Sequence, residues 1–273
     1  MIRKWEAMLL VAMFAVACRS SAPVAVVTPA PPAGPAWQEQ LAQQNADAAI
    51  YQNTSAEIHR LYEQCYELAS IRLKENMGVA DKRPPAVITD IDETVLDNSP
   101  FQITSAAKGR PYTPDTWHEW ALMGSAKALP GSLEFMRSAH QEGCEIFYIS
   151  NRSTSEKNAT IKNLYELGFP NADEAHVMCM EGTSDKTDRR GLVAKEHHVV
   201  LVLGDQLRDF DERFKDRTTE YGRNVVLAMQ DTLERYFIML PNPMYGTWLD
   251  AVAGKMDSLK VEKKAAFFKA NSY

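Results

Sequence analysis

The amino-acid sequence predicts an α/β fold in which helices flank a central parallel sheet, with a smaller helical and aromatic-rich cap region beside it. Short apolar segments end in polar residues at positions 86–90, 145–150 and 199–205, and segments with helical spacing of apolar residues separate them. Strands that alternate with helices form parallel sheets through right-handed crossovers. An aromatic-rich stretch at 99–129 interrupts this alternation and predicts the smaller region.

Residues 1–18 predict an exported protein. Positive charge at residues 3 and 4 precedes a mostly apolar stretch at 7–17 that is too short for a permanent membrane helix, which is typical of a signal peptide. The segment from Ala15 to Cys18 resembles a bacterial lipobox, in which the Cys is acylated after cleavage. We therefore expect an outer-membrane lipoprotein, anchored through Cys18, that faces the periplasm or the cell surface. Cleavage near Ala17 without acylation, which gives a soluble periplasmic protein, is the alternative.

The rest of the chain predicts a tether followed by one globular domain. Residues 19–36 are dominated by Pro, Ala and Val, a composition that favours extended chain without a core. Residues 37–273 form the expected domain, because the chain is 45% hydrophobic and 24% charged. The net charge of −6, with both signs interspersed, argues against nucleic acid as a partner. The other cysteines lack metal-type spacing and are expected to be free thiols in the core: Cys65, Cys144 and Cys179.

Helices are expected before the first strand and between the strands. Residues 37–77 contain no Gly or Pro, and apolar residues recur at Ile58, Leu61, Cys65 and Leu68, which predicts one or two helices. Further helices are expected from about residue 130 and from about 155 to 167. The stretch 99–129 and the N-terminal helices are expected to cap the site, although an aromatic cluster under a long loop fits the stretch equally well.

Acidic residues follow the first predicted strand. The segment DIDETVLD at 90–97 holds four carboxylates in eight residues, and such a cluster repels itself unless a cation binds it. Mg²⁺ prefers oxygen ligands and usually takes one or two protein carboxylates, which leaves places for water and phosphate. Asp90 and Asp92 are therefore candidate ligands of Mg²⁺.

A second acidic pair follows the strand predicted at 199–205. In the segment GDQLRDF, Gly204 allows a tight turn, so that Asp205 can point toward the edge of the sheet. Ligands of parallel sheets bind beyond the carboxyl ends of the strands, where both acidic segments fall. We expect Asp205 to be a metal ligand and Asp209 to stand behind it or to act as an alternative ligand.

Two polar segments lie between the acidic ones. YISNR supplies Ser150, Asn151 and Arg152, whose hydroxyl and nitrogen donors suit phosphate oxygens. SDKT supplies Lys186, a compact cation that also suits phosphate. These four residues are the candidate substrate-binding groups.

Taken in order, these motifs resemble the class C acid phosphatases of the haloacid dehalogenase (HAD) superfamily, and especially the lipoprotein 5′-nucleotidase branch. The resemblance runs from about residue 37 to the C-terminus, including NPMYGTW at 242–248, and implies a Rossmann-like core. It implies a nucleophile at Asp90, a general acid/base at Asp92 and a metal carboxylate at Asp205. It also implies that Ser150 and Lys186 bind phosphate and that Trp117 and Tyr245 are the aromatics that sandwich a nucleoside base. A homodimer is a further expectation from the resemblance.

The expected reaction is Mg²⁺-dependent hydrolysis of a phosphomonoester, with 5′-nucleotides as the expected substrates. Asp90 would attack phosphorus and form an aspartyl-phosphate, while Asp92 would protonate the leaving group and later activate water. A haloalkanoate dehalogenase would not need Asp92, because halide leaves without a proton. Two alternatives stay open: a broad-specificity phosphatase or phosphotransferase for non-nucleotide monoesters, and a surface lipoprotein that binds nucleotide or haem without turnover.

Overall fold

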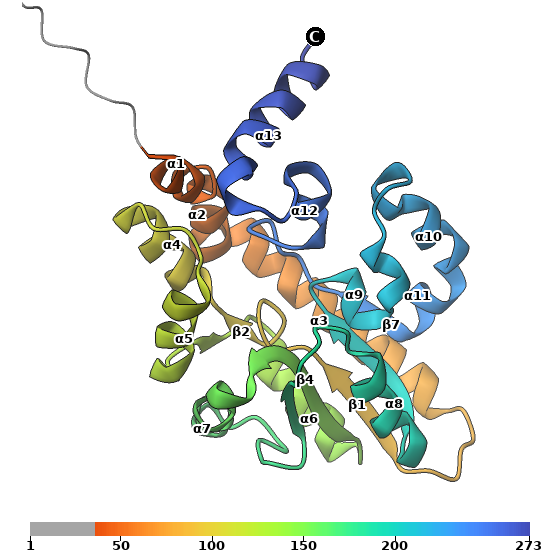
Figure 1. Cartoon of the computed structure of the whole chain (residues 1–273). Coiled ribbons are helices and arrows are strands. Elements are labelled where there is room, and N and C mark those ends of the chain that lie inside the picture. Colours follow the sequence, from red (N-terminus) through yellow and green to blue (C-terminus); the bar gives the residue numbers. More distant parts are fainter. Residues whose placement is uncertain (1–35) are drawn as a thin grey trace, which may run out of the picture. The chain divides into compact units, whose positions relative to one another are not determined.

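The structure is a computed structural model that describes residues 36–273 (Figure 1). The predicted signal peptide, the tether and Cys18 lie outside the described residues. Among the residues that are described, no helix is both long enough and apolar enough to cross a membrane.

A parallel sheet of five strands confirms the predicted α/β fold. Its order is β5-β4-β1-β6-β7, and every neighbouring pair is parallel. The three inner strands are those that the sequence predicts: β1 (Pro85–Thr89), β4 (Glu145–Ser153) and β6 (His198–Gly204). The edge strands β5 (Val177–Met180) and β7 (Phe237–Met239) are too short to give a periodic signal in the sequence.

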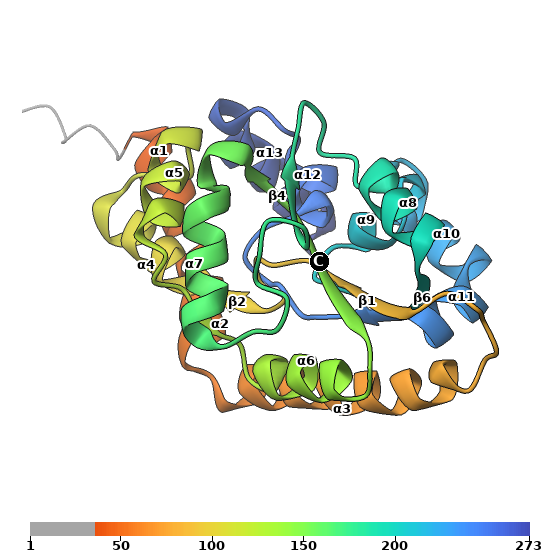
Figure 2. The same ribbon diagram turned by 90° about the horizontal axis from the view of Figure 1, so that it is seen from below.

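Both faces of the sheet are buried, which explains why its inner strands are continuous apolar runs rather than alternating ones. On β1, Val87 packs into one core, whereas Ala86 and Ile88 pack into the other. Figure 2 shows α3 and α6 (Ser132–Gln141) lying along one side of the sheet, with α8 (Thr187–Glu196) and α9 (Leu207–Phe210) on the other.

The segment before β1 forms three helices rather than one or two: α1 (Trp37–Gln43), α2 (Ala46–Thr54) and α3 (Ala56–Met77). Ser55 separates α2 from α3, and its side chain accepts hydrogen bonds from the backbone at the start of α3. The remaining helices, in chain order, are α4 (Ser99–Lys108), α5 (Pro114–Met123), α7 (Lys157–Leu167), α10 (Arg223–Ala228), α11 (Gln230–Tyr236), α12 (Thr247–Ala253) and α13 (Asp257–Asn271).

Of the apolar residues whose spacing indicates α3, Ile58 is buried but the leucines are not. Leu61 and Leu68 are each 42% exposed, whereas Tyr62 and Tyr66 are buried. The tyrosine rings fill the core, and their hydroxyls donate to backbone carbonyls: Tyr66 to Thr94 at 2.6 Å and Tyr62 to Pro241 at 2.7 Å. Because a buried tyrosine needs such a partner, the face of α3 is chosen by acceptors that lie far away in the sequence.

A two-stranded ribbon ties the inserted region to the end of β1. β2 (Leu96–Asp97) pairs antiparallel with β3 (Lys127–Ala128), so the two ends of the insertion are held together. The turn before β2 contains Glu93 in a left-handed conformation (φ 54°), and the Glu93 side chain accepts a hydrogen bond from the Asn98 backbone. The ribbon thereby places α4 and α5 beside the carboxyl end of β1.

Candidate active site

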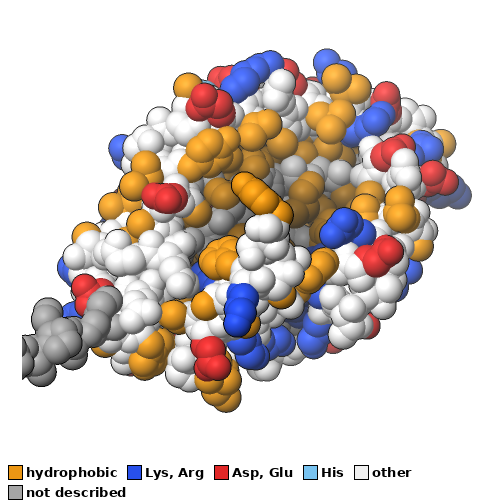
Figure 3. Space-filling model, turned by 90° about the horizontal axis from the view of Figure 1, so that it is seen from above, with side chains coloured by type: hydrophobic (Ala, Val, Ile, Leu, Met, Phe, Trp, Pro, Cys, Tyr) orange, Lys and Arg blue, Asp and Glu red, His pale blue; other side chains and the backbone are white. Residues whose placement is uncertain are grey.

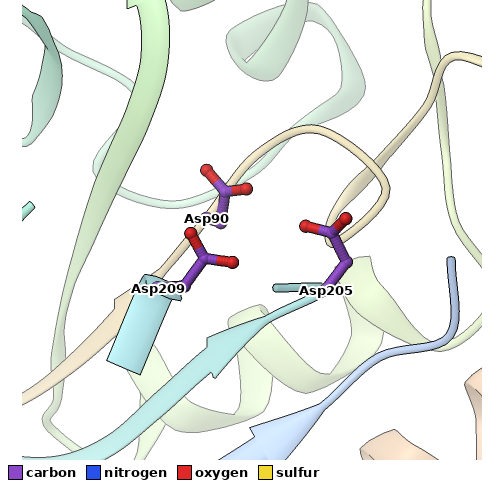
Figure 4. A group of neighbouring side chains, drawn as sticks. All are labelled: Asp90, Asp205 and Asp209. Carbon is purple, nitrogen blue, oxygen red and sulfur yellow. The ribbon is translucent and has the colours of Figure 1, made fainter. Parts of the chain in front are cut away.

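Three carboxylates meet where β1 and β6 end. Asp90 follows β1 directly, and Asp205 follows β6. The two strands are neighbours, and the Asp90 backbone donates to the Leu203 carbonyl at 2.9 Å. Together with Asp209 of α9, they offer carboxylate oxygens that all lie within 4.8 Å of one another. Figure 4 shows the three side chains grouped at this edge of the sheet. The structure thus brings Asp90, Asp205 and Asp209 together, as the sequence predicts.

Gly204 allows Asp209 to join this group. A Cβ at position 204 would lie 2.5 Å from the Cβ of Asp209, so a side chain there would displace the carboxylate. The Gln206 backbone donates to Oδ2 of Asp209 at 2.9 Å and fixes the turn. Close approach, rather than an unusual backbone angle, is therefore the reason for glycine at this position.

Lys186 neutralises part of this charge. Its ammonium is buried and donates to Oδ1 of Asp90 at 2.6 Å and to Oδ1 of Asp209 at 2.7 Å. Burial disfavours the charged form, but Asp209 and Asp90 outweigh it and raise the pKa of Lys186. Three carboxylates and one ammonium leave two negative charges, which a divalent cation would balance.

The carboxyl pKa values also fit a cation. Burial raises the pKa of Asp90 well above its ordinary value, although Lys186 opposes the shift. Burial and then Asp209 raise the pKa of Asp205 to about 7. Carboxylates that are this costly to ionise indicate a shortage of nearby positive charge, and their oxygens are the donors that hard divalent cations prefer.

Asp205 is held by two amides that the sequence did not predict. Asn242 Nδ2 and Gln206 Nε2 donate to Oδ2 of Asp205 at 2.7 and 2.8 Å, which leaves Oδ1 available as a ligand atom. Gln206 is the residue next to Asp205, and Asn242 opens the segment NPMYGTW, so both stand in recognised motifs. The hydrogen bond from Asn242 to Asp205 joins residues that are 37 positions apart, so nothing in the sequence signals it.

The side chain of Asp92 lies outside this group of three. Arg152 donates to Oδ1 of Asp92 from Nη2 at 2.8 Å and from Nε at 3.0 Å, and Asn98 donates at 2.9 Å. Arg152 is 2% exposed, and its Nη1 is satisfied by Thr160. Burial would lower the pKa of Arg152, but Asp92 outweighs it and raises that pKa. The guanidinium thus fixes the Asp92 carboxylate, a contact that differs from the predicted one to phosphate.

The other predicted phosphate-binding residues have separate surroundings. Ser150 is buried beside Asp92: its hydroxyl accepts from the Arg152 backbone and donates to Oδ2 of Asp92 at 3.4 Å. Asn151 lines the cavity, and its side chain binds Arg189 at 2.7 Å and the Ser184 carbonyl at 3.1 Å. Arg189, which the sequence did not predict, therefore helps to hold the loop that carries Lys186.

A cavity of about 540 Å³ extends from the carboxylates. Figure 3 looks onto a hollowed face where hydrophobic side chains gather around the depression. Trp117 and Tyr245 both line the cavity, with residues of α1 and of the α4–α5 insertion, which are the predicted cap elements. The Trp117 ring packs edge-on against Phe101 at 5.4 Å between ring centres, and the Arg152 guanidinium lies 5.6 Å from its centre.

A parallel sheet with Asp90 and Asp92 after its central strand, and Lys186 and Asp205 at the same edge, defines a phosphatase of the HAD superfamily. A family model described as HAD superfamily subfamily IIIB, acid phosphatase, matches residues 12–248. The chain therefore belongs to this acid phosphatase family.

Known proteins agree with this assignment. The structure resembles the class C acid phosphatase from Bacillus anthracis with a TM-score of 0.78 and 35% identity, over 83% of this chain and 97% of that one. Acid phosphatase 1 of Solanum lycopersicum is 24% identical over 198 residues, which is 69% of this chain and 68% of the tomato protein. The Stem 31 kDa glycoprotein of Glycine max is 27% identical over 166 residues, 58% of each chain.

We predict that the metal-free protein is less stable at pH 8 than at pH 5. The pKa of Asp205 rises from 3.8 to about 7 on folding, so the proton stabilises the fold fully below pH 3.8 and this contribution is lost as pH rises through 7. Mg²⁺ at about 100 times its Kd should restore roughly 2.7 kcal/mol, with the larger rise in Tm at pH 8, because ligands must be ionised. Thermal unfolding at both pH values measures both effects.

The Asp205→Asn variant is the control for this prediction. It should lose the part of the pH dependence that Asp205 contributes, while the part from Asp90 stays, and it should lose most of the rise in Tm with Mg²⁺, because the amide neither titrates nor supplies a charged ligand. An equal rise in Tm in the variant and the wild type would place the cation elsewhere.

Proposed function

We propose that this acid phosphatase is a Mg²⁺-dependent enzyme that hydrolyses nucleoside 5′-monophosphates through an aspartyl-phosphate on Asp90. One observation carries the chemical part of the proposal. Asp90 and Asp92 line the same cavity but have different partners, an ammonium for Asp90 and a guanidinium for Asp92. Two carboxylates with separate environments suit two roles in one reaction.

In this proposal the first step is attack by a carboxylate oxygen of Asp90 on phosphorus, in line with the ester oxygen that leaves. Lys186 already contacts Asp90, so its ammonium is positioned to donate to a phosphoryl oxygen as charge develops there. Mg²⁺, held by Asp90, Asp205 and Asp209, would supply further positive charge to the phosphoryl oxygens.

The proton steps belong to Asp92. As the P–O bond breaks, its carboxyl group donates a proton to the leaving oxygen, and it later takes a proton from the water that hydrolyses the aspartyl-phosphate. Arg152 and Asn98 hold the Asp92 carboxyl by hydrogen bonds from three nitrogen atoms, so that its orientation is set before substrate binds.

Asp92→Asn should lower kcat by roughly a factor of 10² to 10⁴ for an alkyl phosphate, because that is the usual effect of a positioned acid/base. The loss should be smaller for 4-nitrophenyl phosphate, whose leaving group needs little protonation. Asp90→Asn, the matched control, should abolish turnover of both substrates. Equal losses on the two substrates in Asp92→Asn would remove the acid role from Asp92.

The nucleotide part of the proposal rests on the aromatic walls of the cavity. Trp117 and Tyr245 come from distant parts of the chain, yet both line the space beyond the carboxylates. A flat base can stack on such rings, and stacking does not read base edges, so purine and pyrimidine nucleotides should both be accepted. A broad-specificity phosphatase or phosphotransferase is the second candidate, because the buried charges select phosphate and not the leaving group.

Trp117→Ala should lower kcat/KM for 5′-nucleotides by about 5- to 150-fold, the equivalent of 1–3 kcal/mol for stacking of a base on an aromatic ring. Glycerol phosphate, which has no base, should lose much less and reports any disturbance of Arg152 beneath the ring. Trp117→Phe should recover part of the nucleotide activity. Losses in the same proportion on both substrates would reduce Trp117 to a packing residue.

For localisation, we propose that Cys18 carries lipid and anchors the protein to the outer membrane, on the lipobox-like sequence alone. The mature protein should partition into detergent, and Cys18→Ser should lose this property, since several acyl chains hold a protein to a membrane. Recovery of both forms in the soluble periplasmic fraction would favour ordinary secretion.

A further inference from the structure

The outer end of the cavity is built by a part of the chain that the family model does not match. The match ends at residue 248, whereas the cavity is also lined by Leu249 and Asp250 of α12 and by Asp257, Lys260 and Lys264 of α13. Most of α12 and all of α13 thus lie outside the residues that the family model matches.

The two lysines at this end differ in their partners. Lys260 is paired with Asp257 at 2.9 Å and with Asp250 at 3.4 Å. Lys264, one helical turn further on the same face of α13, has no hydrogen bond or ion pair within the part of the chain that the structure describes. Burial, and then the neighbouring Lys260, lower the pKa of Lys264. Lys264 is thus a half-buried amine that faces the cavity without a counter-ion.

We propose that Lys264 binds a second anionic group on the leaving group of the substrate. The substrate class is then a phosphomonoester with a phosphate at each end, separated by a flat or apolar part. This inference rests on the proposed function, since the Lys186 end takes the scissile phosphate and the aromatic walls take the middle of the molecule. The cavity volume of about 540 Å³ lies within the range of sites for whole small molecules and exceeds what one phosphate needs.

The lining of the cavity supplies the groups that such a substrate needs. Lys186 lines it among the buried carboxylates, and Lys264 lines it from the exposed helix α13. Tyr112, Trp117 and Tyr245 line the same cavity and supply aromatic surface. Lys260 is engaged by Asp250 and Asp257, so Lys264 is the ammonium at this end that keeps its hydrogen-bonding capacity for an anion among the described residues.

The test compares adenosine 3′,5′-bisphosphate with adenosine 5′-monophosphate as competitors of 4-nitrophenyl phosphate hydrolysis, at low salt. Competition reports affinity whether or not the nucleotides are hydrolysed. The wild type should bind the bisphosphate more tightly, and Lys264→Gln should reduce this preference about fivefold, since a half-exposed ion pair is partly screened. Asp257→Asn should increase the preference by removing a competing carboxylate.

Lys269→Gln is the matched control, because it removes the same charge from an exposed position of α13 outside the cavity. It should leave the preference unchanged. The same preference in the wild type and in Lys264→Gln would overturn the second anion site while leaving nucleotide binding intact. Failure of both nucleotides to compete would overturn both proposals.

Discussion

Burial of negative charge at the ends of β1 and β6 is the constraint on which this structure depends. Asp90, Asp205 and Asp209 are all less than a tenth exposed, and ionised carboxylates are costly to bury without partners. Lys186 joins Asp90 to Asp209, whereas the hydrogen bonds to the Asp205 side chain come from the amides of Gln206 and Asn242. Amides satisfy lone pairs but supply no charge. The remaining deficit of positive charge suits the site to a cation, and a bound cation would supply the positive charge that a phosphoryl group needs.

The sequence predicted the members of this site better than their contacts. Asp90 and Asp205 could be placed because parallel strands bring their carboxyl ends to one edge, and strand ends are visible as polar residues after apolar runs. The pairing of Arg152 with Asp92, and the contact of the buried Ser150 hydroxyl with the same carboxylate, could not be predicted, because they depend on side-chain directions after β4. The burial of Tyr66 on α3 could not be predicted for a similar reason, since it depends on a distant backbone acceptor.

Arg152 joins two parts of the molecule that would otherwise act separately. Its guanidinium holds Asp92 and lies over the ring of Trp117, while Asn98 also donates to Asp92 and accepts from Trp120 on α5. The α4–α5 insertion is therefore attached to the side chain that the proposal assigns to proton transfer. A leaving group that displaces the Trp117 ring would press on the same guanidinium that orients Asp92. The insertion and Asp92 thus share contacts with one buried cation.

The two ends of the cavity differ in how far they can change. At the inner end, Gly204 has no room for a side chain. Lys186 is fixed between two carboxylates, so a neutral residue in its place would leave buried charges unpaired. At the outer end, α13 has no fully buried residue, and replacing Lys264 removes no hydrogen bond of the described structure. Substitutions on α13 therefore cost little stability. Charge pairing therefore constrains the inner end of the cavity, whereas residues of α13 can change with little effect on the fold.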